Sequence, residues 1–184
     1  MQSVEYVVLV DEQNKVVGTR QKSTIHQKQT PLHRGFSTFI FNSKGEVLLQ
    51  QRSLNKKTWP GVWSNTCCGH PSLNENSEEA AKRRLEFELG LKIENLKEVF
   101  NYRYCFSRFG VMENEICPVV IGFSDQAPAR NPSEVADFKY LDWQEFLRQV
   151  DLEGDVWSQW CVEESKILNT NPYFIKFYSN LKNA

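Results

Sequence analysis

The segment from residue 77 to residue 90 carries the clearest signals of regular structure, and it constrains the fold most. Ser77 suits a helix N-cap, and Glu78 and Glu79 follow in the first turn, where the helix dipole favours acidic side chains. Gly90 is a typical helix terminator. An apolar stripe at i, i+4 spacing lies between these ends: Ala81, Leu85 and Leu89. We therefore predict one amphipathic helix with one face against a core.

Short runs rich in β-branched and aromatic residues lie on both sides of this helix and predict strands. The runs are residues 6–10, 36–41, 47–51, 99–106, 116–123 and 138–141. Residues 42–45 have turn-forming side chains and predict a hairpin between the second and third runs. Pro118 indicates an edge position or a bulge. Two late helices are predicted at 143–150 and 157–168.

One helix between hairpins and further helices near the end favour an α+β fold, a layered α/β/α domain. The 184 residues suit a single domain spanning 1–184, with an apolar fraction of 40% that is typical of a globular protein. Residues 23–34 and 53–69 are predicted to be loops. The second is long, and long loops in compact domains tend to be functional.

The charge balance argues against broad electrostatic partners. With 22 basic and 23 acidic side chains, the chain has neither the footprint of a nucleic-acid-binding protein nor that of a membrane-surface protein. It contains no signal-peptide pattern and no apolar stretch of the roughly 20 residues that span a bilayer. Five cysteines, two of them adjacent, favour reduced thiols over a disulfide framework. We therefore expect a cytoplasmic protein, a monomer or a weak dimer.

The predicted helix lies within a motif that resembles the Nudix box. That box runs Gly, five residues, Glu, seven residues, then Arg-Glu-apolar-x-Glu-Glu-x-Gly-apolar. Seven positions match: Gly69, Glu75, Arg83, Leu85, Glu88, Gly90 and Leu91. Arg84 and Phe87 stand where two glutamates of the box belong. The resemblance implies a Nudix-like fold with a mixed β-sheet.

The two substitutions weigh against hydrolysis, because several carboxylates at one helix are needed to hold the metal ions that activate water. Glu88 alone still suits one Mg²⁺ whose octahedron is completed by substrate oxygens. Considered without the rest of the box, Arg84 and Glu88 are better explained as an ordinary i, i+4 ion pair worth about 0.2–0.5 kcal/mol.

A second set of candidate metal ligands lies outside the box. The chain has three histidines, all in segments that contain Pro or Gly: His26, His33 and His70. Glu113 and Glu115 flank Asn114 in a predicted strand, where alternation puts both carboxylates on one face. Two adjacent carboxylates repel each other unless a cation joins them. By spacing alone this signal is weak, because solvated loop histidines and a solvated strand end also explain it.

Taken together, the motifs resemble those of type 1 isopentenyl-diphosphate isomerases over about residues 4–165. The motifs are Trp-Pro-Gly-Val-Trp from residue 59, Cys-Gly-His-Pro from residue 68, the altered Nudix box and Glu-Asn-Glu from residue 113. The last 20 residues carry no recognised motif. The resemblance implies reversible conversion of isopentenyl diphosphate into dimethylallyl diphosphate, by protonation and deprotonation through a carbocation in isoprenoid biosynthesis. The partner it implies is thus a small prenyl diphosphate.

The resemblance also implies roles for individual residues. Cys68 and Glu115 would act on opposite faces of the double bond, with Cys67 as a structural neighbour. Tyr104 and Trp160 would line the substrate site, where the face of Trp160 stabilises the carbocation by cation–π attraction. Glu115, polarised by a metal and by Tyr104, is the candidate proton donor, and Cys68 acts as thiol or thiolate. Because the reaction is reversible, acid and base stay unassigned.

The ligands of two metal sites follow from the same resemblance. The five ligands of a Mn²⁺ or Zn²⁺ site would be His26, His33, His70, Glu113 and Glu115; ligand type does not choose between these ions. A Mg²⁺ ion against the diphosphate would be held by Glu88 and the carbonyl oxygen of Cys68. The basic side chains that would contact the diphosphate are Lys22, Arg52, Lys56 and Arg84.

Three other functions are alternatives. A Nudix hydrolase of nucleoside or prenyl diphosphates needs the missing glutamates. A non-catalytic diphosphate-binding module has no need for both Cys68 and Glu115. A structural zinc domain is disfavoured, because the five nitrogen and oxygen ligands do not resemble a closed Cys₄ or Cys₂His₂ site.

Overall fold

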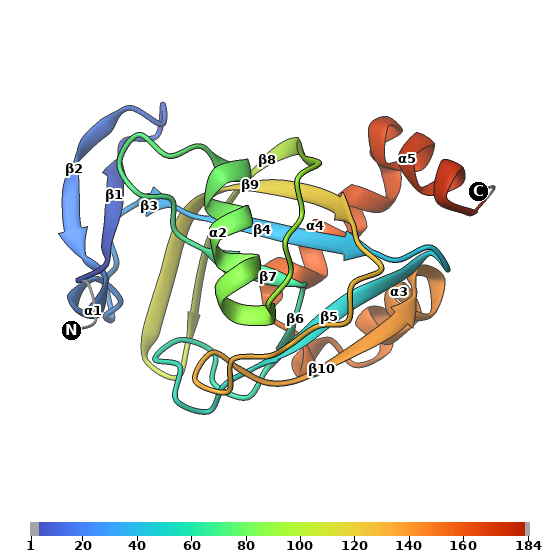
Figure 1. Ribbon diagram of the computed structural model, residues 1–184. Coiled ribbons are helices and arrows are strands. Elements are labelled where there is room, and N and C mark those ends of the chain that lie inside the picture. Colours follow the sequence, from blue (N-terminus) through green and yellow to red (C-terminus); the bar gives the residue numbers. More distant parts are fainter. Residues whose placement is uncertain (1–3, 183–184) are drawn as a thin grey trace.

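In a computed structural model that describes residues 4–182, helices cover both faces of a mixed β-sheet (Figure 1). The strands are β1 (Tyr6–Val10), β2 (Val16–Gln21), β3 (His33–Arg34), β4 (Phe36–Phe41), β5 (Glu46–Arg52), β6 (Trp63–Ser64), β7 (Cys67–Gly69), β8 (Leu96–Arg108), β9 (Val111–Phe123) and β10 (Val135–Asp142). The helices are α1 (Lys22–Ile25), α2 (Ser77–Leu89), α3 (Trp143–Leu152), α4 (Gln159–Thr170) and α5 (Pro172–Lys182), with a 3₁₀ turn at Gly154–Val156.

The strand order explains how distant segments meet. The main path runs β10-β5-β4-β9-β3-β1-β2, and β6, β7 and β8 pair with β5, β4 and β9. Strand β9 is parallel to both β3 and β4, whereas its pairing with β8 is antiparallel. Helix α2 lies on one face of this sheet, and α3 and α4 lie on the other (Figure 1). The prediction of an α+β fold with a mixed sheet is confirmed.

The core lies on both faces of the sheet, because successive side chains of a strand point to opposite sides. Phe39 and Phe41 of β4 pack with Trp143 of α3. Ile40, between them in the sequence, packs instead with Leu85 of α2. All of these side chains are fully buried, and burial of each stabilises the fold by about 1.5–3 kcal/mol.

Helix α2 has the predicted end at Gly90 but a different N-cap. Asn76, not Ser77, is the cap: its side chain accepts a hydrogen bond from the backbone N–H of Glu79 at 2.8 Å. The carboxylate of Glu79 accepts one in return from the backbone N–H of Asn76 at 3.0 Å, which completes a capping box. The prediction for Ser77 is wrong because its hydroxyl donates to Glu98 instead. The predicted apolar stripe of α2 is fully buried.

Pro118 was expected at a sheet edge or a bulge, but β9 is a central strand. Ile116 pairs with β3 and Val119 pairs with β4, so the parallel partner of β9 changes around Pro118. A proline is tolerated where one ladder ends and the next begins. The backbone irregularity lies across the hairpin in β8, as a register shift between Glu98 and Phe100.

Several short elements lie in segments predicted to be loops. Residues 23–34 contain most of α1 and all of β3, and residues 53–69 contain β6 and β7. Two- and three-residue strands are too short to show a period of two in the sequence. Helix α5 occupies the last part of the described chain, where Phe174 packs on Phe41 with ring centroids 5.4 Å apart.

Two further expectations concern the chain as a whole. Among residues 4–182, no helix combines the length and apolar character that crossing a membrane requires. The five cysteines are free thiols, as predicted.

Candidate active site

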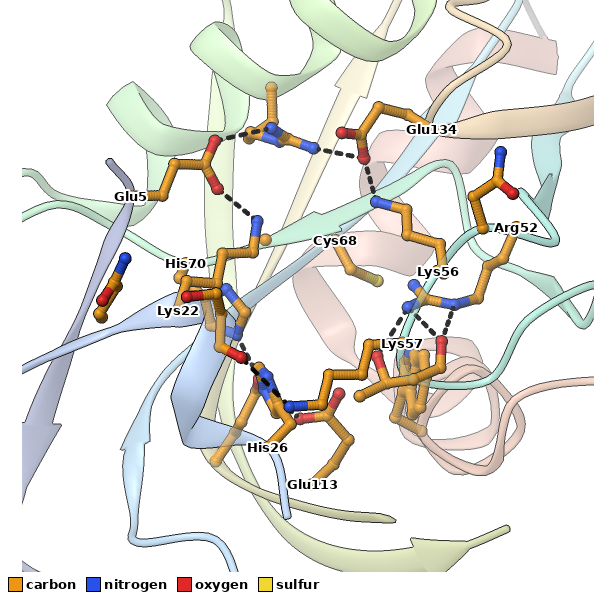
Figure 2. A pocket seen from close by; sticks show the side chains of 18 of the residues that line it. Glu5, Lys22, His26, Arg52, Lys56, Lys57, Cys68, His70, Glu113 and Glu134 are labelled. Atoms are coloured by element: carbon orange, nitrogen blue, oxygen red, sulfur yellow. Dashed lines mark hydrogen bonds and ion pairs between the residues drawn. The ribbon is translucent and has the colours of Figure 1, made fainter. Parts of the chain in front are cut away.

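Five side chains with nitrogen or oxygen donors meet beside one cavity. They are His26, His33, His70, Glu113 and Glu115, and their ligand atoms lie within 4.8 Å of one another. Nε2 of His33 lies 3.2 Å, and Nε2 of His70 3.0 Å, from Oε1 of Glu115. Figure 2 shows His26, His70 and Glu113 on the same side of the cavity. The structure thus brings together all five residues of the predicted Mn²⁺ or Zn²⁺ site.

The register of the sheet assembles this cluster. Parallel pairing of β3 with β9 places His33 opposite Glu115. Nδ1 of His33 lies 2.9 Å from the carbonyl oxygen of Pro31, which leaves Nε2 toward the cluster. Gly35 has no side chain because none fits: a Cβ atom there would lie 1.9 Å from Oε2 of Glu115. Sequence reasoning missed Gly35.

The cluster fits a divalent cation on its own chemistry. Nε2 of His26, Nε2 of His33 and Oε2 of Glu113 are buried, and their close contacts with one another and with Glu115, at 3.0 and 3.2 Å, lack the geometry of hydrogen bonds. A buried polar atom without a partner costs about 1–3 kcal/mol. A cation among these atoms removes that cost, and mixed imidazole and carboxylate ligands suit Mn²⁺ or Zn²⁺.

The protonation states of His70 and Glu115 favour cation binding. Burial lowers the pKa of His70 to about 4, so its imidazole is neutral at neutral pH. Burial alone raises the pKa of Glu115, but the imidazoles of His33 and His70, 3.2 and 3.0 Å away, outweigh it and hold that pKa well below its usual range. Neutral imidazole and ionised carboxylate are the forms that bind metal ions.

A cavity of about 650 Å³ joins this cluster to the other predicted site residues (Figure 2). Its walls include Cys68, Tyr104, Trp160 and the four predicted diphosphate contacts Lys22, Arg52, Lys56 and Arg84. Its size is within the range of small-molecule sites, roughly 300–1,000 Å³. Lys57, which sequence reasoning missed, also lines the cavity and donates to the carbonyl oxygen of Ser23 at 3.2 Å.

Two carboxylates hold the cationic side chains in place. Glu134 accepts hydrogen bonds from Lys56 and from Nη2 of Arg84, the latter at 3.0 Å. Glu5 lies 2.5 Å from Nζ of Lys22 and 3.5 Å from Nη1 of Arg84. These contacts hold Lys22, Lys56 and Arg84 in place before any anion binds, and these three side chains form the cationic wall of the cavity. Figure 2 labels Lys22 and Lys56 with their partners Glu5 and Glu134.

The pair of Arg84 and Glu88 is not an ordinary surface ion pair. The side chains are 4% and 1% exposed, and Nη2 of Arg84 lies 2.5 Å from Oε1 of Glu88. Gln50 donates to the other oxygen of Glu88 at 3.2 Å. Burial raises the pKa of Glu88, but Lys56 and Arg84 outweigh it, so the net shift is downward and the carboxyl group is ionised.

Asn65 links the predicted catalytic residues and was missed by sequence reasoning. Its Oδ1 accepts hydrogen bonds from Sγ of Cys68 at 3.1 Å and from Nε1 of Trp160 at 3.2 Å. Its Nδ2 donates to the backbone carbonyls of Thr38 and Cys67, which fixes the orientation of the amide. The only sequence signal is its place four residues after the Trp-Pro-Gly turn.

Aromatic rings and the two proton-transfer candidates share one part of the cavity. The hydroxyl of Tyr104 donates to Oε2 of Glu115 at 2.7 Å, and its ring stacks on Trp160 with centroids 5.9 Å apart. Burial, with a smaller effect of Glu164, raises the pKa of Cys68 to about 12. The thiol therefore holds its proton while Glu115 is ionised, which is a complementary pair for proton transfer.

Comparisons with known proteins agree with this geometry. The NUDIX domain family matches residues 31–161. An isopentenyl-diphosphate Delta-isomerase of Saccharopolyspora erythraea is 45% identical over 175 residues, covering 92% of this chain and 90% of that protein. One of an Enterobacter species is 38% identical and covers 97% of each chain.

Solved structures agree on the fold. A crystal structure of a Deinococcus radiodurans protein superposes with a TM-score of 0.70 at 23% identity, covering 88% of this chain and 98% of that chain. At that identity the likeness supports the fold alone. The sequence relatives carry the finer assignment, and the chain belongs to the Nudix family and, within it, to the isopentenyl-diphosphate Delta-isomerases.

Proposed function

We propose that this chain interconverts isopentenyl diphosphate and dimethylallyl diphosphate in the cavity between its cationic wall and its histidine cluster. The observation that carries this proposal is the content of that one cavity. Cations suited to a diphosphate lie on one wall, and a protonated thiol, an ionised carboxylate and two stacked aromatic rings lie within reach of the rest of a small ligand. A module that only binds diphosphate would need the cations but not the thiol, the carboxylate or the aromatic rings.

The reaction moves one double bond and needs two proton transfers. A proton adds to the terminal alkene carbon, and another leaves the carbon on the far side of the resulting tertiary cation. Cys68 holds a proton and Glu115 can accept one, and each serves as acid in one direction and as base in the other. The Tyr104 hydroxyl keeps Glu115 oriented toward the cavity.

The aromatic rings would stabilise the carbocation. The indole of Trp160 is held by its hydrogen bond to Asn65 and by the rings of Trp59 and Tyr104, with centroids 5.2 and 5.9 Å away. A cation over such a desolvated ring gains about 2 kcal/mol. The same rings exclude water, which would otherwise capture the cation.

Two divalent cations complete the proposal. His26, His33, His70, Glu113 and Glu115 would hold one Mn²⁺ or Zn²⁺, which polarises Glu115. Glu88 and the carbonyl oxygen of Cys68 would hold Mg²⁺, which neutralises the diphosphate. The chain would work as one domain, in the cytoplasm, as a monomer or a weak dimer.

Restoring the missing glutamates of the Nudix box separates this function from hydrolysis. Arg84→Glu combined with Phe87→Glu should raise KM for isopentenyl diphosphate at least roughly tenfold, because charge-assisted contacts of about 1.5–3 kcal/mol are lost and a negative charge replaces them. It should release no phosphate. Kinetics of isomerisation and a phosphate assay on the same samples measure both effects.

Phe87→Glu alone is the matched control. Phe87 is 52% exposed, so this variant should fold and isomerise like the unchanged protein. Efficient phosphate release by the double variant but not by Phe87→Glu would show that Arg84 is needed to prevent hydrolysis, and it would favour the hydrolase alternative.

A further inference from the structure

A buried carboxyl group that none of the motifs includes lies near Cys68. Glu164 follows Trp160 by one turn of α4, so both side chains point from the same face of the helix toward the sheet. Its side chain is fully buried, and neither carboxyl oxygen makes a hydrogen bond of acceptable geometry. Burying a carboxyl group without a hydrogen-bond partner costs free energy of folding.

The buried carboxyl group is neutral at neutral pH. Burial raises the pKa of Glu164 well above its usual range, and Ser37 and Cys117 only partly oppose this shift. A protonated carboxyl group has one O–H donor as well as acceptor oxygens. Glu164 can therefore donate a hydrogen bond, which a carboxylate cannot.

Ser37 connects Glu164 to the thiol of Cys68. Pairing of β4 with β7 places Ser37 opposite Cys68, and its Oγ lies 3.6 Å from Sγ of Cys68. The same Oγ lies 3.4 Å from Sγ of Cys117, on β9 at the other side of β4. Ser37 is fully buried, and it is one of two side chains, with Cys117, that partly oppose the upward shift in the pKa of Glu164.

The side chains of Glu164, Ser37, Cys68 and Asn65 can form a chain of hydrogen bonds in which each one donates to the next. Glu164 can donate to the hydroxyl of Ser37, and Ser37 can donate to the sulfur of Cys68. The thiol of Cys68 donates to Oδ1 of Asn65 at 3.1 Å. Each donor is used once, and such chains strengthen one another in a buried environment. Without Glu164, the hydroxyl of Ser37 is free to turn toward Cys117.

We propose that Glu164 is a positioning residue: its protonated carboxyl group turns to donate a hydrogen bond to Ser37, and Ser37 thereby fixes the Cys68 thiol in the orientation that faces the cavity. This role depends on the proposed function, in which Cys68 transfers a proton. It adds to the site a second residue of α4, one turn after Trp160.

Replacing Glu164 with leucine separates this role from simple packing. Leucine has a similar volume and cannot hydrogen-bond, so Glu164→Leu should fold with an equal or higher Tm. Loss of the chain of donors should lower kcat roughly 10- to 100-fold, with KM for isopentenyl diphosphate unchanged because no diphosphate contact is altered. Glu164→Gln should keep kcat near that of the unchanged protein, since an amide both donates and accepts.

Ser37→Ala provides a second variant that does not depend on how Glu164→Leu folds. It should lower kcat by a similar factor, and the double variant should lose no more than either single one, because both remove the same connection. The matched control is Glu163→Leu, since Glu163 is the exposed neighbour on α4 whose carboxylate accepts from Tyr102. Its kcat should not change.

The outcomes distinguish this inference from the proposed function. Full kcat in Glu164→Leu with a raised Tm, or losses that multiply in the double variant, would overturn the positioning role while leaving the isomerase intact. Loss of activity in Glu164→Gln equal to that in Glu164→Leu would also overturn it. An unchanged protein without isomerase activity would overturn the proposed function itself.

Discussion

Cys68→Ala should lower kcat for isomerisation by about 10²–10⁴-fold or more, whereas Cys67→Ala should stay active. Cys68 lines the cavity and directs its thiol to Asn65. Its neighbour Cys67 is fully buried on the other face of the sheet, among residues that pack on α2. The side chains of adjacent residues in a strand point to opposite faces of the sheet, so the two thiols lie in different surroundings.

Steady-state kinetics and thermal unfolding of both variants measure this difference. Cys67→Ala should lower Tm slightly, because it removes a buried sulfur, while its kcat stays close to that of the unchanged protein. Equal losses of kcat in the two variants, or full activity in Cys68→Ala, would contradict the assignment of Cys68.

His33→Ala, His26→Ala and His70→Ala should each lose bound transition metal and activity together. His33 is fully buried and lies 3.2 Å from Glu115, so its removal leaves two histidines and a carboxylate pair with no third nitrogen ligand. We expect activity to fall about 10²-fold or more, since Glu115 would lose the cation proposed to polarise it. Metal content and kcat measured on the same preparations test whether the two losses coincide.

The pH dependence of metal content tests in the unchanged protein whether the histidines bind the metal. Burial lowers the pKa of His33, but the negative charge of Glu115, 3.2 Å away, outweighs it, so the net shift is upward from 6.5. A cation must displace that proton, and occupancy should therefore fall as pH decreases through the raised pKa of His33. Full metal content in all three variants, or occupancy independent of pH, would show that these histidines are not ligands.

Features with fixed spacing were predictable from the sequence, whereas features made by tertiary pairing were not. The stripe of α2 and the alternation of Glu113 and Glu115 follow from the periods of helix and strand, and both are found in the structure. The cap at Asn76 was missed because Ser77 has an equally suitable side chain. Choosing between them needs the position of Glu98, which lies on another element.

The missed residues of the site share one property: each matters because of a contact with a segment distant in the sequence. Asn65 is a neutral amide whose role appears when β7 and α4 come together. Gly35 is needed because β3 and β9 bring Glu115 against it. Glu164 looks like one of many helical glutamates until its complete burial is known.

Incorporation of solvent deuterium into the product distinguishes isomerisation by proton transfer from hydrolysis. In heavy water with Mg²⁺, the protein should convert isopentenyl diphosphate into dimethylallyl diphosphate that carries deuterium in the new methyl group, because the added proton comes from a side chain that exchanges with solvent. NMR of the product locates the label, and a phosphate assay runs in parallel with Cys68→Ala as the inactive control. We expect labelled product without inorganic phosphate or diphosphate; release of phosphate at the rate of substrate loss, or product without the label, would contradict isomerisation by proton transfer.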